Sequence, residues 1–150
     1  LKDSISAVRK SIVEICKKYS FAVDPDKKVY EMSVSEKQTL EIVKVLYRGA
    51  DILILDEPTA VLTPQETEAL FKVMRAMKAD GKSIVIITHK LHEVLEISDR
   101  VAVLRKGEYI GEVETSKTDA QSLSDMISPL YTSDAADELT REVLSGRRLS

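Results

Sequence analysis

Two short apolar runs constrain the fold of this 150-residue chain more than any other feature: DILILD at 51–56 and SIVIIT at 83–88. Their composition predicts strands that are buried on both faces of a sheet. A strong helix start lies between them, because the TPQE sequence at 63–66 supplies a cap, a proline in the first turn and a glutamate at the third position. A strand, a crossover helix and a second strand form a βαβ unit, so we expect two parallel neighbours in an α/β fold.

Helical patterns precede the first strand. Apolar residues in 4–19 recur at the spacing of an amphipathic helix, and Cys16 lies on its apolar face, which indicates a core residue rather than a reactive thiol. A loop is predicted over 21–31 because it contains an Asp-Pro-Asp turn sequence. A second helix is expected over 33–47, since it begins with a Ser-x-x-Glu capping box.

The segments after position 63 also have clear periodicity. The helix that follows the TPQE sequence should pack an apolar face on the core and end at Gly81. That face carries Leu70, Phe71, Val73, Met74 and Met77. A short helix with Leu91, Val94 and Leu95 inward is expected over 90–97, and residues 100–114 predict two strands joined as a hairpin.

Composition excludes several classes of protein. A hydrophobic content of 43% with 31% charged residues is typical of a soluble globular protein. The net charge of -3 gives no basic excess for a nucleic-acid surface. A single cysteine leaves no internal disulfide and fits a reducing compartment. The apolar runs are too short to span a bilayer, and no secretory signal is expected at the start.

Three polar side chains follow the two predicted strands. Asp56 and Glu57 end the first run, and His89 follows the second. In open α/β sheets ligands bind outside the carboxyl ends of the strands, so these groups should converge at one edge. Nucleotide hydrolysis fits them: one carboxylate holds Mg²⁺ through water, the other orients the attacking water, and the histidine donates to a phosphate.

Simpler interpretations of the same residues exist. The Asp56-Glu57-Pro58 sequence is also compatible with an ordinary strand exit in which Asp56 accepts hydrogen bonds of a turn. His89 is compatible with an ordinary loop residue. His92, in the following helix, is expected to face solvent.

Three segments in this order resemble the ATP-binding domain of ABC transporters: MSVSE at 32–36, ILILDEPTAVLT at 52–63 and IITHK at 86–90. The resemblance covers roughly residues 1–127. It implies a partial P-loop NTPase fold, with a mostly parallel sheet flanked by helices and part of the helical signature subdomain. The sequence TAVLTPQE resembles the corresponding segment in the first of two tandem ATPase domains of importers for simple sugars and nucleosides.

The resemblance implies a role for each strand-end residue. Asp56 would coordinate Mg²⁺ through water. Glu57 would be the general base toward the attacking water, and His89 would contact the γ-phosphate of ATP.

The resemblance also implies a phosphate site at the start of the second helix. Ser33 and the backbone N–H groups of Val34, Ser35 and Glu36 would reach the γ-phosphate of ATP held by the opposite ATPase domain, and a helix N-terminus binds anions. Helix capping is a simpler role for Ser33 and is compatible with this one. The chain departs from the family pattern at Ser35, where glycine is usual, and at Thr39, where arginine is usual.

A larger departure is the phosphate loop. No Gly-x-x-x-x-Gly-Lys-Ser/Thr sequence is present, and the chain begins with Leu1. We therefore expect residues 1–128 to be the C-terminal part of an ATP-binding domain that does not hydrolyse ATP alone. The string LYTSDAADE resembles a translated sequencing adapter, so residues 129–150 are expected to be a non-native tail. A divergent natural linker is the alternative.

The implied whole protein pairs with a second ATPase domain and docks on membrane permease subunits at the cytoplasmic face of the membrane. A periplasmic or lipoprotein substrate-binding protein would be an indirect partner, and no nucleic acid is expected. Two rival hypotheses remain at this point. One is a soluble ABC ATPase of translation or DNA repair, and the other is a degenerate ABC domain that binds ATP without hydrolysing it.

Overall fold

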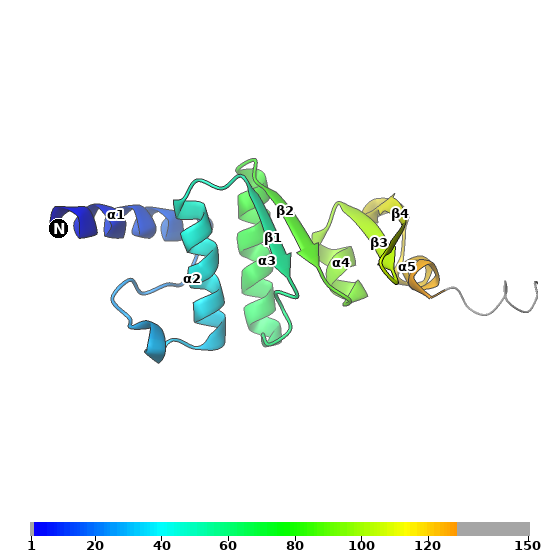
Figure 1. Cartoon of the computed structure of the whole chain (residues 1–150), viewed down its shortest axis with the longest axis horizontal. Coiled ribbons are helices and arrows are strands. Elements are labelled where there is room, and N and C mark those ends of the chain that lie inside the picture. The colour runs from blue at the N-terminus through cyan, green and yellow to red at the C-terminus, as the bar shows by residue number, and fades with distance from the viewer. Residues whose placement is uncertain (1, 129–150) are drawn as a thin grey trace, which may run out of the picture. The chain divides into compact units, whose positions relative to one another are not determined.

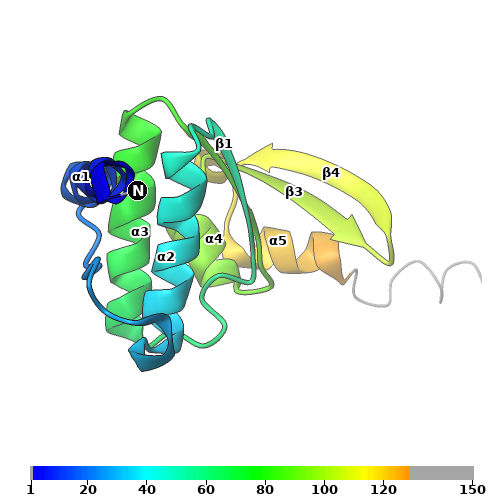
Figure 2. The same ribbon diagram turned by 60° about the vertical axis from the view of Figure 1, so that its left-hand side comes forward.

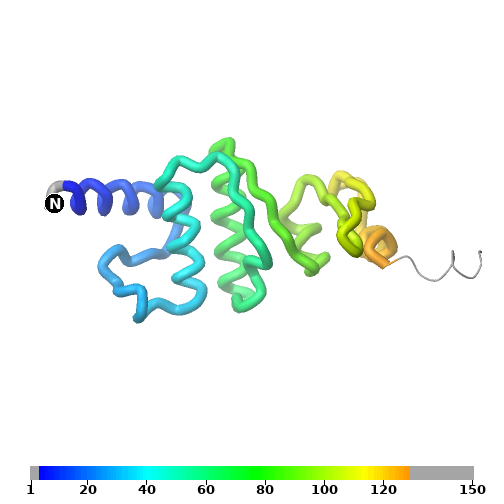
Figure 3. Tube along the Cα trace, viewed as in Figure 1, coloured from blue at the N-terminus to red at the C-terminus, as the bar shows by residue number. Residues whose placement is uncertain are grey.

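The computed structural model describes residues 2–128, and its chain path can be followed in Figure 3. The chain divides between His89 and Lys90 into two compact units, each of which is described by itself. The tail predicted over 129–150 lies outside the described residues.

In the first unit two helices precede a strand–helix–strand sequence (Figure 1). Its elements are α1 (Lys2–Tyr19), the 3-10 turn η1 (Val29–Glu31), α2 (Val34–Tyr47), β1 (Ile52–Asp56), α3 (Pro64–Ala79) and β2 (Ser83–Ile87). The second unit has α4 (Leu91–Ile97), β3 (Arg100–Arg105), β4 (Glu108–Glu114), the 3-10 turn η2 (Thr115–Lys117) and α5 (Ala120–Ile127). The η1 turn lies within the segment that was predicted to be a loop.

The strands β1 and β2 are parallel neighbours, as the βαβ pattern predicts. Their register pairs Ile52 with Ser83 at one end and Asp56 with Ile87 at the other. The crossover helix α3 packs against β2. The carboxyl ends of both strands therefore meet at one edge of the sheet.

The prediction that both faces of these strands are buried is wrong. Leu53 is buried, but Ile52 and Ile54 expose 64% and 68% of their surface, and Val85 and Ile87 of β2 are also exposed. Successive side chains of a strand point to opposite faces. Helix α3 covers one face, and the other is left open, so the apolar composition of the strands overstates their burial.

Helices α2 and α3 both begin with the capping boxes that the sequence predicts. In α2 the Ser33 Oγ accepts the Glu36 N–H at 3.2 Å, and Glu36 Oε2 accepts the Ser33 N–H at 2.7 Å. Thr63 and Glu66 make the same reciprocal pair at the start of α3. These bonds satisfy N–H groups that a helix start leaves without intrahelical partners, so each start is fixed.

Apolar side chains of the helices make most of the core of the first unit, where α1, α2 and α3 lie together (Figure 2). The buried residues of this unit are Cys16, Tyr19, Met32, Ile42, Val43, Leu46, Leu53, Pro58, Thr59, Leu70, Phe71, Val73, Met74 and Met77. The five predicted inner residues of α3 are all among them. Burial raises the pKa of the Cys16 thiol, which agrees with its predicted place in the core.

The second unit contains the predicted hairpin. β3 and β4 are antiparallel, and the turn between them has positive φ at Lys106 (50°) and Gly107 (82°), as the favoured two-residue hairpin turns require. Helix α5 was not predicted. It is capped by Asp119, whose Oδ1 accepts the Ser122 N–H at 2.7 Å, and it buries Leu123 completely while packing on α4 and β3.

Helix α4 lies where the sequence predicts it, but its burial differs. Leu91, Val94 and Leu95 are half-buried, and Glu93 is the buried residue. The Lys90 ammonium lies 3.4 Å from the Glu93 carboxylate. A buried carboxylate is favourable only when it is paired. The pattern of apolar residues alone therefore could not predict that Glu93 is buried. Among residues 2–128 no helix is long and apolar enough to cross a membrane.

Polar contacts join the C-terminal ends of α1 and α3. The Tyr19 hydroxyl donates to the Asp80 carboxylate, and the Lys18 ammonium lies 2.8 Å from it. The hydrogen bonds from Lys18 and Tyr19 hold the pKa of Asp80 below its ordinary value. Asp80 therefore stabilises the folded chain when it is ionised.

The pH dependence of stability tests this contact. Because the folded-state pKa of Asp80 is lowered, its contribution is present above the ordinary aspartate pKa of about 3.9 and is lost as the pH falls through the lower folded-state pKa. We expect Asp80→Asn to reduce the free energy of unfolding at pH 7 and to converge with the wild type in acid. Urea denaturation between pH 7 and pH 2.5 measures this, and a constant difference across that range would contradict it.

The core of the first unit predicts the effect of truncating its central aromatic residue. Phe71 exposes 1% of its surface, so Phe71→Ala should lower the free energy of unfolding by about 3–5 kcal/mol. Lys72→Ala, at the next and exposed position of the same helix, is the matched control and should change it by less than about 0.5 kcal/mol. Urea denaturation followed by circular dichroism compares the two variants, and equal losses would contradict the burial.

Candidate active site

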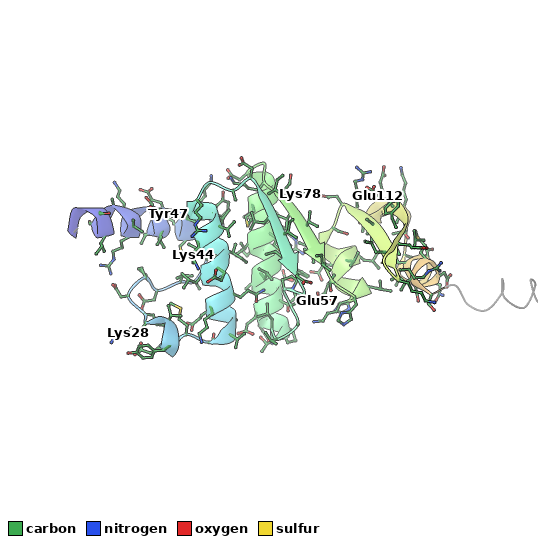
Figure 4. The ribbon with its side chains drawn as sticks, in the orientation of Figure 1. Lys28, Lys44, Tyr47, Glu57, Lys78 and Glu112 are labelled. Carbon is green, nitrogen blue, oxygen red and sulfur yellow. The ribbon has the colours of Figure 1, made fainter. Side chains whose placement is uncertain are left out.

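The edge at which β1 and β2 end is shaped by an unusual backbone conformation at Glu57. Its φ is 45°, a region that residues other than glycine rarely adopt. The Glu57 N–H donates to the Ile87 carbonyl at 2.8 Å and so continues the pairing one residue beyond Asp56. The backbone then turns away, and Figure 4 shows Glu57 at the end of β1.

Glu57 and His89 are joined at this edge. The Nδ1 of His89 lies 2.9 Å from Oε1 of Glu57. The histidine side chain is 79% exposed and the glutamate side chain 36%. The parallel register brings these residues, 32 positions apart, within hydrogen-bond distance, as the sequence predicts for groups at neighbouring strand ends.

The second carboxylate oxygen of Glu57 has a different environment. Among the described residues, Oε2 is a buried side-chain oxygen with no hydrogen-bond partner. A buried acceptor without a donor is costly and therefore uncommon. Glu57 thus has one oxygen held by His89 and one buried oxygen without a hydrogen-bond donor.

Asp56 is the last residue of β1 and is exposed. Within residues 2–128 no cluster of three or more His, Cys, Asp or Glu side chains is arranged to hold a metal ion. A single exposed carboxylate still fits Mg²⁺, because that ion usually keeps several waters and takes other ligands from substrate phosphates.

The start of α2 carries the other predicted site residues. Val34 and Ser35 are its first two residues, and Val34 is exposed. Of the three N–H groups predicted to bind phosphate, that of Glu36 donates to Ser33 within the capping box. The Lys27 ammonium bonds both oxygens of Glu36 at 2.8 and 2.9 Å, and these bonds, with that from the Ser33 N–H, hold the pKa of Glu36 below its ordinary value.

Sequence reasoning missed Gln38, which connects the two parts of the site. Its side-chain amide donates to the Pro58 carbonyl at 2.6 Å, so α2 is tied to the residue directly after Glu57. It also missed a second contact of Glu66, whose Oε1 accepts the Ser35 hydroxyl at 2.7 Å. Both bonds join residues far apart in sequence, so no local pattern could reveal them.

A family model for ABC transporters matches residues 6–60. A nucleoside import ATP-binding protein of Lactococcus lactis subsp. cremoris is 44% identical over 123 residues, which are 82% of this chain and 24% of that protein. A glucose import ATP-binding protein of Haloferax volcanii is 48% identical over 116 residues, 77% of this chain and 21% of that protein. A ribose import ATP-binding protein of Hahella chejuensis is 42% identical over 132 residues, 85% of this chain and 26% of that protein.

The chain resembles the ATP-binding proteins of ABC transporters. It spans about a quarter of the length of the curated relatives it matches, with shares of 24%, 21% and 26%. The family resemblance that the sequence suggests is thereby confirmed.

Solved ABC structures share the fold of the chain. An inward-facing ABC transporter of the metal-chelate type matches with a TM-score of 0.69 at 15% identity, over 79% of this chain and 48% of that one. An ABC ATP-binding cassette in its ADP conformation matches with a TM-score of 0.67 at 23% identity, over 83% of this chain and 47% of that one. At these identities the likeness concerns the fold, which is a partial ABC ATPase fold.

The Glu57–His89 bond predicts the tautomer of the histidine. An ionised carboxylate only accepts hydrogen bonds, so Nδ1 must carry the proton when Glu57 is ionised. We expect the ¹⁵N spectrum of neutral His89 to show protonated Nδ1, and Glu57→Ala to abolish this preference. His92 is exposed and is the matched control in the same spectrum. Identical tautomers for His89 and His92 in the wild type would contradict the bond.

Proposed function

We propose that the chain is part of the ATP-binding subunit of an ABC importer, and that the whole protein couples ATP hydrolysis to the uptake of a simple sugar or nucleoside. The observation that carries the catalytic part is the Glu57–His89 hydrogen bond beside the partnerless Oε2 of Glu57. Support for import comes from the relatives, whose names are those of nucleoside, glucose and ribose import proteins.

In this proposal Glu57 is the general base. His89 holds Oε1, so the carboxylate has one orientation, and Oε2 accepts a proton from the attacking water. Asp56, one residue earlier, holds Mg²⁺ through water. That ion, when bound with ATP, neutralises charge on the phosphates.

His89 supports the phosphate side of the reaction. With Nδ1 engaged by Glu57, its other ring nitrogen, Nε2, is the one that can contact the γ-phosphate. Donation from Nε2 while Nδ1–H still bonds Glu57 requires the imidazolium form, because a neutral imidazole carries only one N–H. The positive charge would then favour a phosphate at this position.

The start of α2 serves the opposite ATPase domain. Ser33 and the first N–H groups of α2, those of Val34 and Ser35, are proposed to bind the γ-phosphate of ATP held by that domain, since a helix N-terminus attracts anions. A second ATPase domain and membrane permease subunits are the proposed direct partners. A substrate-binding protein acts indirectly, and the protein is peripheral at the cytoplasmic face of the membrane.

The two rival hypotheses are less well supported. The relatives described above are import proteins, which does not favour an ABC ATPase of translation or DNA repair. A degenerate domain that binds ATP without hydrolysing it is not favoured either, since Asp56, Glu57 and His89 are all present at one edge.

Replacing the proposed base tests this function. In a protein of the length of its relatives that carries this segment, Glu57→Gln should lower the rate of ATP hydrolysis about 10²–10⁴-fold, because the water loses its proton acceptor. ATP binding should persist, and ATP-driven uptake of labelled ribose or nucleoside by membranes that contain the permease should stop.

Glu41→Gln is the matched control, because Glu41 is an exposed glutamate on α2 that pairs with Lys44. It should leave hydrolysis and uptake at the wild-type rate. Hydrolysis by Glu57→Gln at the wild-type rate would rule out the proposed base.

A further inference from the structure

One carboxylate touches the starts of two helices. Glu66 Oε2 accepts the Thr63 N–H at 2.9 Å in the capping box of α3. Its other oxygen, Oε1, accepts the hydroxyl of Ser35 at 2.7 Å, and Ser35 belongs to the first turn of α2. The hydrogen bonds from Thr63 and Ser35 hold the pKa of Glu66 below its ordinary value, so the carboxylate is ionised at neutral pH.

The direction of the neighbouring hydrogen bonds follows from this contact. A serine hydroxyl has one proton, and that of Ser35 is donated to Glu66. The oxygens of Ser33 and Ser35 lie 3.0 Å apart, so in this contact Ser33 must be the donor. Ser33 Oγ in turn accepts the Glu36 N–H. The bonds run in one direction from Glu36 through Ser33 and Ser35 to Glu66, and we call these four residues the serine relay.

The corresponding glutamate of α2 has a different partner. Glu36 occupies in α2 the position that Glu66 occupies in α3, but the Lys27 ammonium bonds both of its oxygens. Glu66 instead receives a neutral hydroxyl from the start of α2. Glu36 is thus paired with a cation, whereas the carboxylate bonded to the Ser35 hydroxyl at the start of α2 is that of Glu66.

Ser35 and Thr39, the two residues of α2 that depart from the family pattern, contact each other. Thr39 Oγ1 donates to the Ser35 carbonyl at 2.9 Å, which fixes the backbone of Ser35 from one helical turn away. A glycine in place of Ser35 would have no hydroxyl for Glu66, so the serine relay depends on the departure itself.

We propose that Ser35 is a positioning residue, whose hydrogen bonds to Ser33 and Glu66 hold the Ser33 hydroxyl proton away from an incoming phosphate and bring the charge of Glu66 to the phosphate-binding start of α2. The relay weakens anion binding at this helix start. The proposal rests on the phosphate role that the proposed function gives to α2. A phosphate must break the Ser33–Ser35 bond before Ser33 can donate to it. The negative charge of Glu66 also opposes the attraction that the positive end of the helix dipole exerts on a phosphate.

Carboxyl titration tests the relay without any nucleotide. In the full chain labelled with ¹³C-glutamate, Ser35→Ala should raise the pKa of Glu66 toward the ordinary glutamate value, and Ser35→Thr, which keeps a hydroxyl, should leave it low. Ser122→Ala removes a hydroxyl from the first turn of α5 and is the matched control, which should leave the pKa of Glu66 unchanged. An unchanged Glu66 pKa in Ser35→Ala would overturn the relay.

Titration with inorganic phosphate at pH 7 tests the consequence. The amide signals of residues 33–36 should report binding that is about two- to five-fold tighter in Ser35→Ala than in the wild type, the size of a single charge effect at a helix start. Glu66→Gln should also bind more tightly, because it removes the charge without removing Ser35. Circular dichroism identifies a variant that fails to fold, in which case the other variant decides.

The outcomes separate the relay from the proposed function. Equal phosphate affinity in the wild type and both variants, with a shifted Glu66 pKa, would overturn the proposed weakening of anion binding. If phosphate shifts the amide signals of residues 33–36 neither in the wild type nor in either variant, the phosphate role of α2 is wrong. The inference that rests on that role is then wrong as well.

Discussion

The parallel pairing of β1 and β2 is the constraint on which the candidate site depends. Its register sets Asp56 opposite Ile87, and the Glu57 N–H extends the pairing by one more bond to the Ile87 carbonyl. A shift by one residue would turn every side chain of the strand to the other face. The register therefore determines that Glu57, rather than a neighbour, meets His89 at the end of the sheet.

Two hydrogen bonds extend this arrangement to the helices. The Gln38 amide holds the Pro58 carbonyl, and the Ser35 hydroxyl holds Glu66. Each bond joins α2 to the chain that follows β1. Helix α2 is thus tied by two side chains to the segment that follows β1.

Local patterns in the sequence predict much of this structure. The capping boxes at Ser33 and Thr63, the parallel strands and the hairpin turn at Gly107 all follow from residue type and spacing. Burial on both faces of the strands was predicted wrongly, because composition does not show whether a covering element is present. Helix α5 was not predicted, and the Ser35–Glu66 bond was missed because it spans 31 positions. The roles of the site residues stay predictions.

Amide hydrogen exchange at Glu57 tests the account most directly, because the whole arrangement requires its N–H to be bonded to the Ile87 carbonyl. The account predicts that this amide exchanges more slowly than it would in an unstructured peptide, although it lies outside the strand and carries a positive φ. Exchange at the rate of an unstructured peptide would mean that the pairing ends at Asp56 and that Glu57 is not held toward His89.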